Sequence, residues 1–184
     1  MKSTQLKQLP DESVLQNEAR IAGLVVIGLL LFIFESYFPR LIPWMKIGLA
    51  NIVTIIALFW LGWRAAVIVS LFRILFGSFL VGALFSPGFF LSLSGGIVSL
   101  IIMIFLYQMR IFGVVVISIA GAMAHNLGQL FVAAIILFRN SIIWYIAPYL
   151  IITSVITGLV IGLISYYVLS RLYKDFIPIE DGLP

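Results

Sequence analysis

The chain of 184 residues is 63% hydrophobic and only 10% charged, with a mean hydropathy of +1.22. Soluble globular chains are nearer half apolar and a quarter charged, so this composition argues against a water-soluble domain and predicts a one-domain integral membrane protein. The absence of cysteine excludes disulfides, cysteine-ligated zinc and iron–sulfur clusters, and the net charge of +4 comes from scattered residues without a cluster suited to nucleic acid.

The apolar segments, taken along the chain, predict an all-α membrane domain of six transmembrane helices. A polar tail, residues 1–19, lacks the layout of a secretory signal; the membrane domain covers residues 20–173, and residues 174–184 form a second tail. The predicted helices cover residues 20–38, 47–61, 65–84, 88–107, 112–138 and 148–173. Most approach the roughly 20 residues that a spanning helix needs, although the second is short. Residues 141–147 are predicted to form a separate interfacial piece, because Pro148 interrupts the run and Trp144 and Tyr145 suit the headgroup boundary.

Lysine and arginine are divided unevenly between the two sides of these predicted helices. Seven fall on one side: Lys2, Lys7, Arg20, Arg64, Arg110, Arg171 and Lys174. Three fall on the other side: Arg40, Lys46 and Arg139. The positive-inside rule therefore predicts that both termini are cytoplasmic. The outer connections FPRLIPWMK and RNSIIWYIAP carry proline and tryptophan and are candidates for an outer gate.

Polar side chains inside the predicted helices share one depth, from the centre of the membrane to its outer half. They are Glu35, Asn51, Arg73, His125, Asn126 and Gln129. Because such residues are costly in the membrane, they are functional candidates by default and predict an outward-facing ligand pocket. Arg73 would anchor an anion or carbonyl, and Glu35 would pair with Arg73 or gate the mouth; the others would supply hydrogen bonds. A purely structural network that holds the helices in register is the alternative.

Small residues recur at spacings that allow close helix packing. The third predicted helix has Ala66, Ser70 and Gly77, and the sixth has Ser154, Gly158 and Gly162. Packing inside the bundle is the simpler interpretation of these patterns. Ala19 and Gly23, at the cytoplasmic end of the first helix, are the best candidates for docking another membrane subunit. In the fourth helix Ser92, Ser94, Gly95, Gly96 and Ser99 could line the pocket or merely pack.

Several chemistries are absent from the sequence. No acidic pair lies within the predicted spans, the chain has one histidine, and it has neither a P-loop nor a dinucleotide-binding fingerprint. The sequence therefore predicts no bound metal, no cofactor and no ATP hydrolysis by this chain itself.

Four stretches, KIGLANIVTIIALFWLG, VSLFRILFGSFLVG, SLSGGIVSLIIM and GAMAHNLGQLFVAA, together resemble one bacterial membrane family over about residues 20–169. It is known as heptaprenyl diphosphate synthase component I and as the Gx transporter family. The family is similar to the substrate-binding S components of energy-coupling factor (ECF) transporters. That similarity implies six helices, cytoplasmic termini, an outward-facing pocket in the bacterial cytoplasmic membrane, and a small-residue patch on the first helix, which Ala19 and Gly23 match loosely.

The resemblance leaves two functions open. The first is uptake of a vitamin-, flavin- or isoprenoid/quinone-related small molecule, with an ECF coupling subunit and ATPases as partners. The second is an accessory subunit in isoprenoid or quinone metabolism, or in flavin-based extracellular electron transfer, with quinone or flavin electron-transfer partners. The chain is not expected to be an enzyme, because prenyl elongation needs aspartate-rich motifs, whereas Asp11, Asp175 and Asp181 all lie in the tails.

Overall fold

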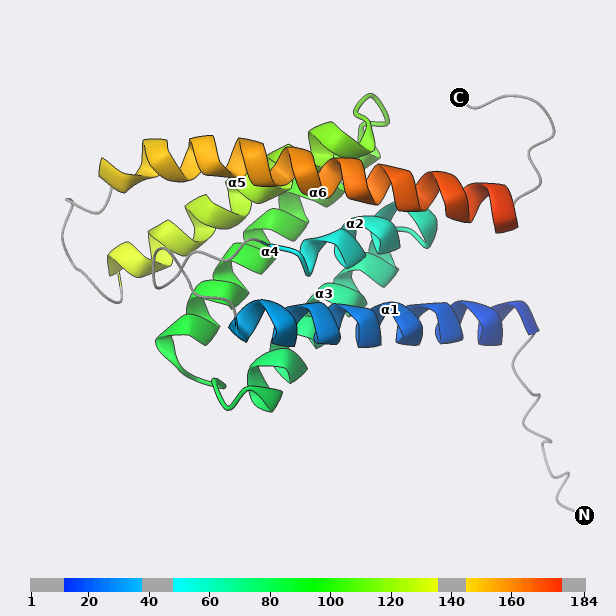
Figure 1. Cartoon of the computed structure of the whole chain (residues 1–184), viewed down its shortest axis with the longest axis horizontal. Coiled ribbons are helices and arrows are strands. Elements are labelled where there is room, and N and C mark those ends of the chain that lie inside the picture. Colours follow the sequence, from blue (N-terminus) through cyan, green and yellow to red (C-terminus); the bar gives the residue numbers. More distant parts are fainter. Residues whose placement is uncertain (1–11, 38–47, 136–144, 177–184) are drawn as a thin grey trace, which may run out of the picture.

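The computed structural model describes residues 12–37, 48–135 and 145–176, and within these ranges all regular structure is helical (Figure 1). In chain order the helices are α1 (Glu12–Tyr37), α2 (Asn51–Trp60), α3 (Trp63–Leu80), α4 (Pro87–Gln108), α5 (Val114–Ala133) and α6 (Ala147–Phe176). The all-helical prediction is confirmed for the described part of the chain.

Five of these helices, all except α2, are long and apolar enough to cross a membrane. Their outer faces carry large exposed apolar side chains, such as Leu30 on α1, Phe79 on α3, Phe105 on α4 and Ile152 on α6. A soluble protein rarely leaves so much apolar surface uncovered, whereas lipid covers it in a membrane protein. The chain is therefore a multi-pass membrane protein.

The second predicted span, residues 47–61, is not confirmed, because the helix found there, α2, has only 10 residues. At 1.5 Å per residue it extends about 15 Å, half the roughly 30 Å of the hydrocarbon core. Residues Val53 to Leu58 of α2 are all buried, and α2 contacts α1, α3 and α6. Figure 1 shows it between α1 and α6. A short helix that is apolar on all sides is stable only inside such a bundle, so α2 is a core helix of the fold.

Two further boundaries differ from the predicted ones. Helix α1 begins at Glu12, inside the predicted polar tail, and its first turns are exposed. Most of the predicted interfacial segment 141–147 lies outside the described residues; Tyr145 and Ile146 form a short 3₁₀ turn that leads directly into α6.

Glycines set the contact between α5 and α6. A Cβ atom on Gly158 would lie 2.7 Å from the Cα of Ile119, and one on Gly162 would lie 2.9 Å from the Cα of Val115. The Ser118 hydroxyl also donates to the carbonyl oxygen of Gly158 at 2.7 Å. The small-residue pattern of α6 thus serves packing within the bundle.

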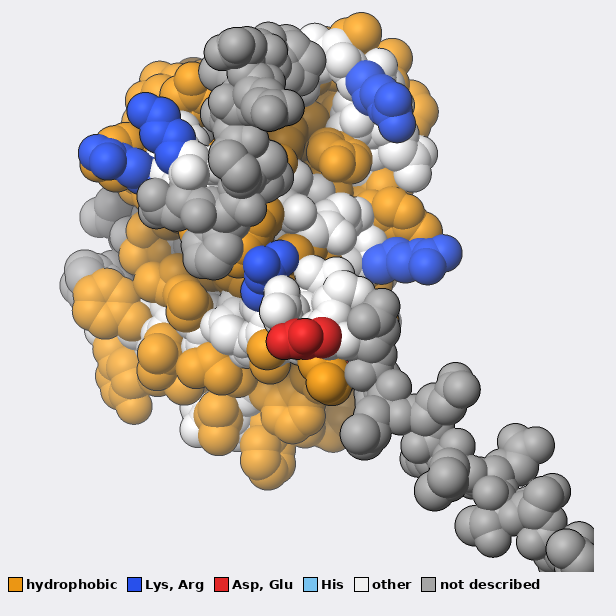
Figure 2. Space-filling model, turned by 90° about the vertical axis from the view of Figure 1, so that its right-hand side faces the viewer, with side chains coloured by type: hydrophobic (Ala, Val, Ile, Leu, Met, Phe, Trp, Pro, Cys, Tyr) orange, Lys and Arg blue, Asp and Glu red, His pale blue; other side chains and the backbone are white. Residues whose placement is uncertain are grey.

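The start of α1 and the ends of α2 and α6 meet at one end of the bundle. The Tyr173 hydroxyl donates to the carbonyl oxygen of Phe59 at 2.9 Å, and the Arg20 guanidinium lies 5.2 Å from the centre of the Trp60 ring. Apart from Arg73, the described basic side chains belong to this end: Arg20, Arg64, Arg110, Arg171 and Lys174. We call it the basic end; Figure 2 shows basic side chains spread around this face.

Candidate functional site

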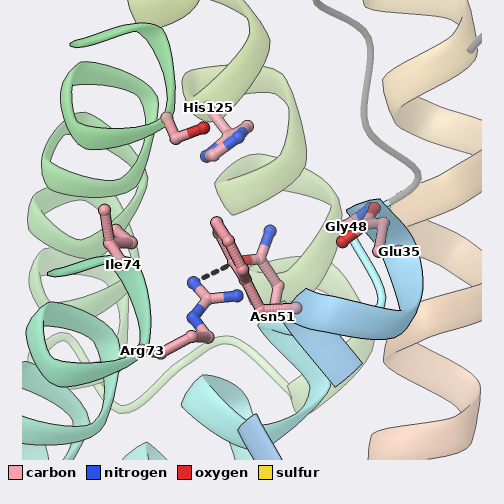
Figure 3. Close-up of a pocket in the computed structure, with 8 residues that line it drawn as sticks. Glu35, Gly48, Asn51, Arg73, Ile74 and His125 are labelled. Atoms are coloured by element: carbon pink, nitrogen blue, oxygen red, sulfur yellow. Dashed lines mark hydrogen bonds between the residues drawn. The ribbon is translucent and has the colours of Figure 1, made fainter. Parts of the chain in front are cut away.

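Arg73 lies on α3 with only 4% of its surface exposed. Its Nη2 donates to Oδ1 of Asn51, the first residue of α2, at 2.8 Å (Figure 3). Its Nε is buried and finds no hydrogen-bond partner among the described residues. A guanidinium has five N–H donors and no acceptor, and a buried donor without a partner is costly. The site therefore contains a cation with donor capacity to spare.

Glu35 is also buried, near the end of α1, but it does not neutralise Arg73 through an ion pair. Its carboxylate accepts a hydrogen bond from the backbone N–H of Gly48, in the turn before α2. No ion pair to Arg73 is found within the described part of the chain, and Figure 3 shows Glu35 and Gly48 together, apart from the guanidinium. Of the two roles predicted for Glu35, direct pairing with Arg73 is thus not seen.

The turn before α2 depends on a glycine. Gly48 has a φ of +85°, a conformation that side chains with a Cβ rarely adopt, and its carbonyl oxygen accepts from the backbone N–H of Asn51 at 2.8 Å. This turn starts α2 beside Arg73. It also aims the N-terminus of α2, which carries partial positive charge, at the same region.

His125 and Gln129 act as a pair on α5. Their Nε2 atoms lie 2.8 Å apart, and Gln129 is 3% exposed. The amide nitrogen of Gln129 can only donate, so the two side chains form a hydrogen bond in the neutral tautomer of His125 that accepts through Nε2. Gly95 of α4 makes room for the pair, because a Cβ there would lie 2.7 Å from Cγ of Gln129.

Asn126 faces a different helix. Its Nδ2 donates to the Ser154 hydroxyl at 2.7 Å and to the carbonyl oxygen of Leu150 at 3.4 Å, both on α6. It does not line the cavity around Arg73. The sequence grouped Asn126 with His125 and Gln129, whereas in the structure its amide ties α5 to α6.

Four of the six predicted site residues line one small cavity of about 20 Å³. The lining consists of Phe32, Glu35, Gly48, Asn51, Arg73, Ile74, Ser92 and His125. We call it the arginine cavity. Gln129 does not line the arginine cavity but contacts His125, which does. A volume of this size accommodates about one water molecule.

A second cavity of about 220 Å³ lies next to it and shares Phe32 and Ser92 with it. Its lining consists of Phe32, Ser36, Ser78, Val81, Ala83, Ser86, Gly88, Phe89 and Ser92. We call it the serine cavity. Sequence reasoning noted Ser92 but missed Ser36, Ser78 and Ser86. The available signal was that all three serines lie close to the ends of apolar segments on one side of the predicted bundle.

Phe32 lies at the boundary because α1 and α3 approach closely there. A Cβ on Gly77 of α3 would lie 2.5 Å from Cδ1 of Phe32, so the phenyl ring occupies the space that a larger residue would fill. Gly28, one turn earlier on α1, packs against the aliphatic part of Arg73, with its ideal Cβ position 3.5 Å from Cδ of Arg73.

Ala19 and Gly23, the predicted docking residues, are both exposed on α1, and no described atom of a neighbouring element lies within 4 Å of a Cβ built on Gly23. Their face is therefore not used for packing within the described bundle.

Comparison with known proteins yields one match. The family model for heptaprenyl diphosphate synthase component I matches residues 24–168, which include all six predicted ligand-site residues but neither Ala19 nor Gly23. No curated protein and no solved structure matches the chain significantly. Because the match covers well over half of the sequence, the chain belongs to the heptaprenyl diphosphate synthase component I family.

Proposed function

We propose that this protein binds a small molecule through an anionic or carbonyl group that Arg73 holds inside the membrane domain. The observation that carries the proposal is the buried Arg73 guanidinium, whose Nε has no partner among the described residues while Nη2 is held by Asn51. Guanidinium groups bind carboxylates and phosphates through two parallel hydrogen bonds, so the remaining donor capacity suits such a ligand.

The N-terminus of α2 supports an anion beside Arg73, whereas the Glu35 carboxylate, which lines the same cavity, is held by the backbone N–H of Gly48. The N-terminus of α2 starts at Asn51, and a helix N-terminus favours negative charge. Interrupted helices whose half-helix ends point at a ligand are a recurring way to build a binding site inside a membrane. Here α2 is such a short helix, and its first residue already contacts the guanidinium.

The cavities of the proposed site lie away from the basic end, toward the end of α1 and the start of α4. If the positive-inside rule holds, the basic end is cytoplasmic, and the arginine and serine cavities lie toward the outer side of a bacterial cytoplasmic membrane. We propose uptake in the manner of an ECF S component, with a coupling subunit that contacts the exposed face around Ala19 and Gly23 and with separate ATPases. The ligand would be a vitamin-, flavin- or isoprenoid/quinone-related molecule.

The family match favours a second candidate function. An accessory subunit of prenyl diphosphate metabolism would also use a buried arginine and a helix N-terminus, because a diphosphate is an anion. The two functions differ in what remains bound after gentle purification: a coupling subunit with ATPases supports uptake, whereas a quinone, a prenyl diphosphate or a flavin-bearing partner supports the accessory role.

A thermal-shift screen of the detergent-purified chain against small carboxylates, phosphates and diphosphates tests the binding proposal. A ligand should raise the Tm of the wild type but not that of Arg73→Gln, which keeps an amide donor for Asn51 and removes the charge. Arg171→Gln is the matched control, because Arg171 is exposed at the basic end, and it should retain the full shift. An undiminished shift in Arg73→Gln contradicts the proposal. Should Arg73→Gln fail to fold, Arg73→Lys is the alternative variant, because it keeps the positive charge. It should lower the affinity at least tenfold, because a lysine ammonium cannot form the two parallel hydrogen bonds that a guanidinium forms with a carboxylate or phosphate.

A further inference from the structure

Two cavities of unequal size meet at Phe32 and Ser92. The arginine cavity, at about 20 Å³, holds little more than one water molecule, whereas the serine cavity has about 220 Å³. A ligand whose anionic group binds Arg73 therefore has room for the rest of its atoms mainly on the serine side. Phe32, one of the two shared residues, is 5% exposed, and its ring lies against Gly77.

Three serine hydroxyls of the serine cavity donate hydrogen bonds to backbone carbonyl oxygens of the protein. Ser36 donates to the carbonyl oxygen of Phe32 at 2.8 Å, and Ser92 donates to that of Gly88 at 2.8 Å. Ser86 donates to the carbonyl oxygen of Ala83 at 2.6 Å. A hydroxyl has one hydrogen and two lone pairs, so each of these oxygens, while it keeps this bond, still offers a lone pair to a donor.

The Ser86 oxygen also caps α4 by accepting from the backbone N–H of Phe89 at 3.2 Å, which uses one of its lone pairs. The Ser36 and Ser92 oxygens accept no hydrogen bond from the described residues. The oxygens of Ser36 and Ser92 thus offer acceptors to the serine cavity, whereas Arg73 offers donors alone. Ser78, which also lines the serine cavity, has a side chain without a hydrogen bond among the described residues and can donate or accept. A molecule with an acceptor group for Arg73 and hydroxyl or N–H donors for these serine oxygens therefore matches the two cavities together.

We propose that the serine cavity is a second subsite for the hydroxyl or ammonium groups of the same ligand whose anionic group binds Arg73, with the Phe32 ring as the partition between the subsites. This inference rests on the proposed function and adds a substrate class: small organic acids that carry hydroxyl or N–H donors several bonds from the acid group. A ligand that fills both subsites passes the position of the Phe32 ring, so the ring moves aside on binding.

Three acids of six carbons test the substrate class: hexanoate, 6-aminohexanoate and gluconate. All carry the carboxylate for Arg73, but only the last two carry donors for the serine oxygens. Affinity for the full chain in mild detergent is measured by isothermal titration calorimetry. At least one of the donor-bearing acids should bind roughly tenfold or more tightly than hexanoate, a gain typical of one or two net hydrogen bonds.

The variant Ser36→Ala should reduce this preference severalfold and leave the affinity for hexanoate within about twofold, because Ser36 lines the serine cavity but not the arginine cavity. Ser170→Ala is the matched control, since Ser170 also donates to its own helix, to the carbonyl oxygen of Tyr167 at 2.7 Å, but lies toward the basic end of α6. Each of these hydroxyls bonds only to the backbone of its own helix, so their loss should leave the fold intact.

The outcomes separate the two proposals. Binding of all three acids that is lost in Arg73→Gln, without any preference for the donor-bearing acids, overturns the second subsite and leaves the arginine site standing. A preference that is undiminished in Ser36→Ala also overturns the subsite. Binding that is unaffected by Arg73→Gln overturns the arginine site, and no binding of any of the three acids to the wild type overturns both.

Discussion

At the scale of single residues, four of the six polar positions that the sequence singled out gather around one cavity, but the sequence could not assign each side chain to a neighbour. Glu35, Asn51, Arg73 and His125 share a depth, and they do line one cavity. Asn126 shares the depth too, but successive residues on a helix point about 100° apart, so Asn126 faces α6 while His125 faces the cavity. The depth of a side chain in the membrane follows from counting residues along its helix. The neighbour that the side chain contacts depends on how the helices pack, which the sequence does not show.

The contacts of Asn126 predict a structural role. Asn126→Ala should lower the Tm in detergent, because the hydrogen bond to Ser154 between α5 and α6 is lost; such bonds contribute about 0.6 kcal/mol on average in membranes. Ligand-induced shifts should stay as in the wild type. Thr157→Ala, which removes a hydroxyl bonded to its own helix backbone, is the control with a smaller expected effect. A loss of ligand response in Asn126→Ala would return this residue to the binding site.

At the scale of helices, apolar runs predicted the five long helices and overestimated α2. Residues 47–61 read as one apolar stretch, but the chain turns at Gly48 with a φ of +85° and becomes helical only from Asn51. Gly48 was the sequence signal for this turn. It was not recognised as a turn residue because a glycine in an apolar run more often serves helix packing. An apolar composition indicates that a segment is shielded from water. It does not distinguish a helix that spans the membrane from a short helix that is buried by its neighbours.

The contact between α1 and α3 gives a paired prediction. Gly77→Ala should destabilise the bundle by about 1–3 kcal/mol, because the new methyl group overlaps the Phe32 ring. Gly28→Ala should be nearly neutral, since its Cβ position lies at ordinary contact distance from Arg73. The readout is the Tm of each purified variant.

Phe32→Leu tests the cause of that effect. Combined with Gly77→Ala, the smaller side chain should recover much of the lost stability, so the two substitutions should not be additive. Strict additivity would show that Gly77→Ala acts through some other contact than the Phe32 ring.

At the scale of the whole molecule, the basic residues that the structure describes are concentrated at one end of the bundle, while Arg40, Lys46 and Arg139 lie outside the described residues. The described basic residues other than Arg73 gather at the end where α1 begins and α6 ends, and both cavities lie away from it, toward the end of α1 and the start of α4. The sequence allowed this distribution to be predicted, because helix boundaries and charge positions are both visible in it. The sizes of the cavities were not predictable, since they depend on how Phe32 and Gly77 pack across two helices.

The absence of native cysteine makes the orientation directly measurable. Tyr145→Cys, just before α6, and Ile111→Cys, between α4 and α5, replace side chains that are 85% and 70% exposed at opposite ends. In intact cells a membrane-impermeant maleimide should label Tyr145→Cys and should label Ile111→Cys only after permeabilisation, as the positive-inside rule requires. The reverse labelling pattern would place the cavities toward the cytoplasm.

Native mass spectrometry of the protein released from gentle detergent tests most directly whether Arg73 anchors a small molecule. The wild type and Arg171→Gln should carry the same bound mass, consistent with an organic acid or a phosphate, and Arg73→Gln should lose it because its charge and paired donors are gone. An equal occupancy of that mass in Arg73→Gln and in the wild type would contradict the account.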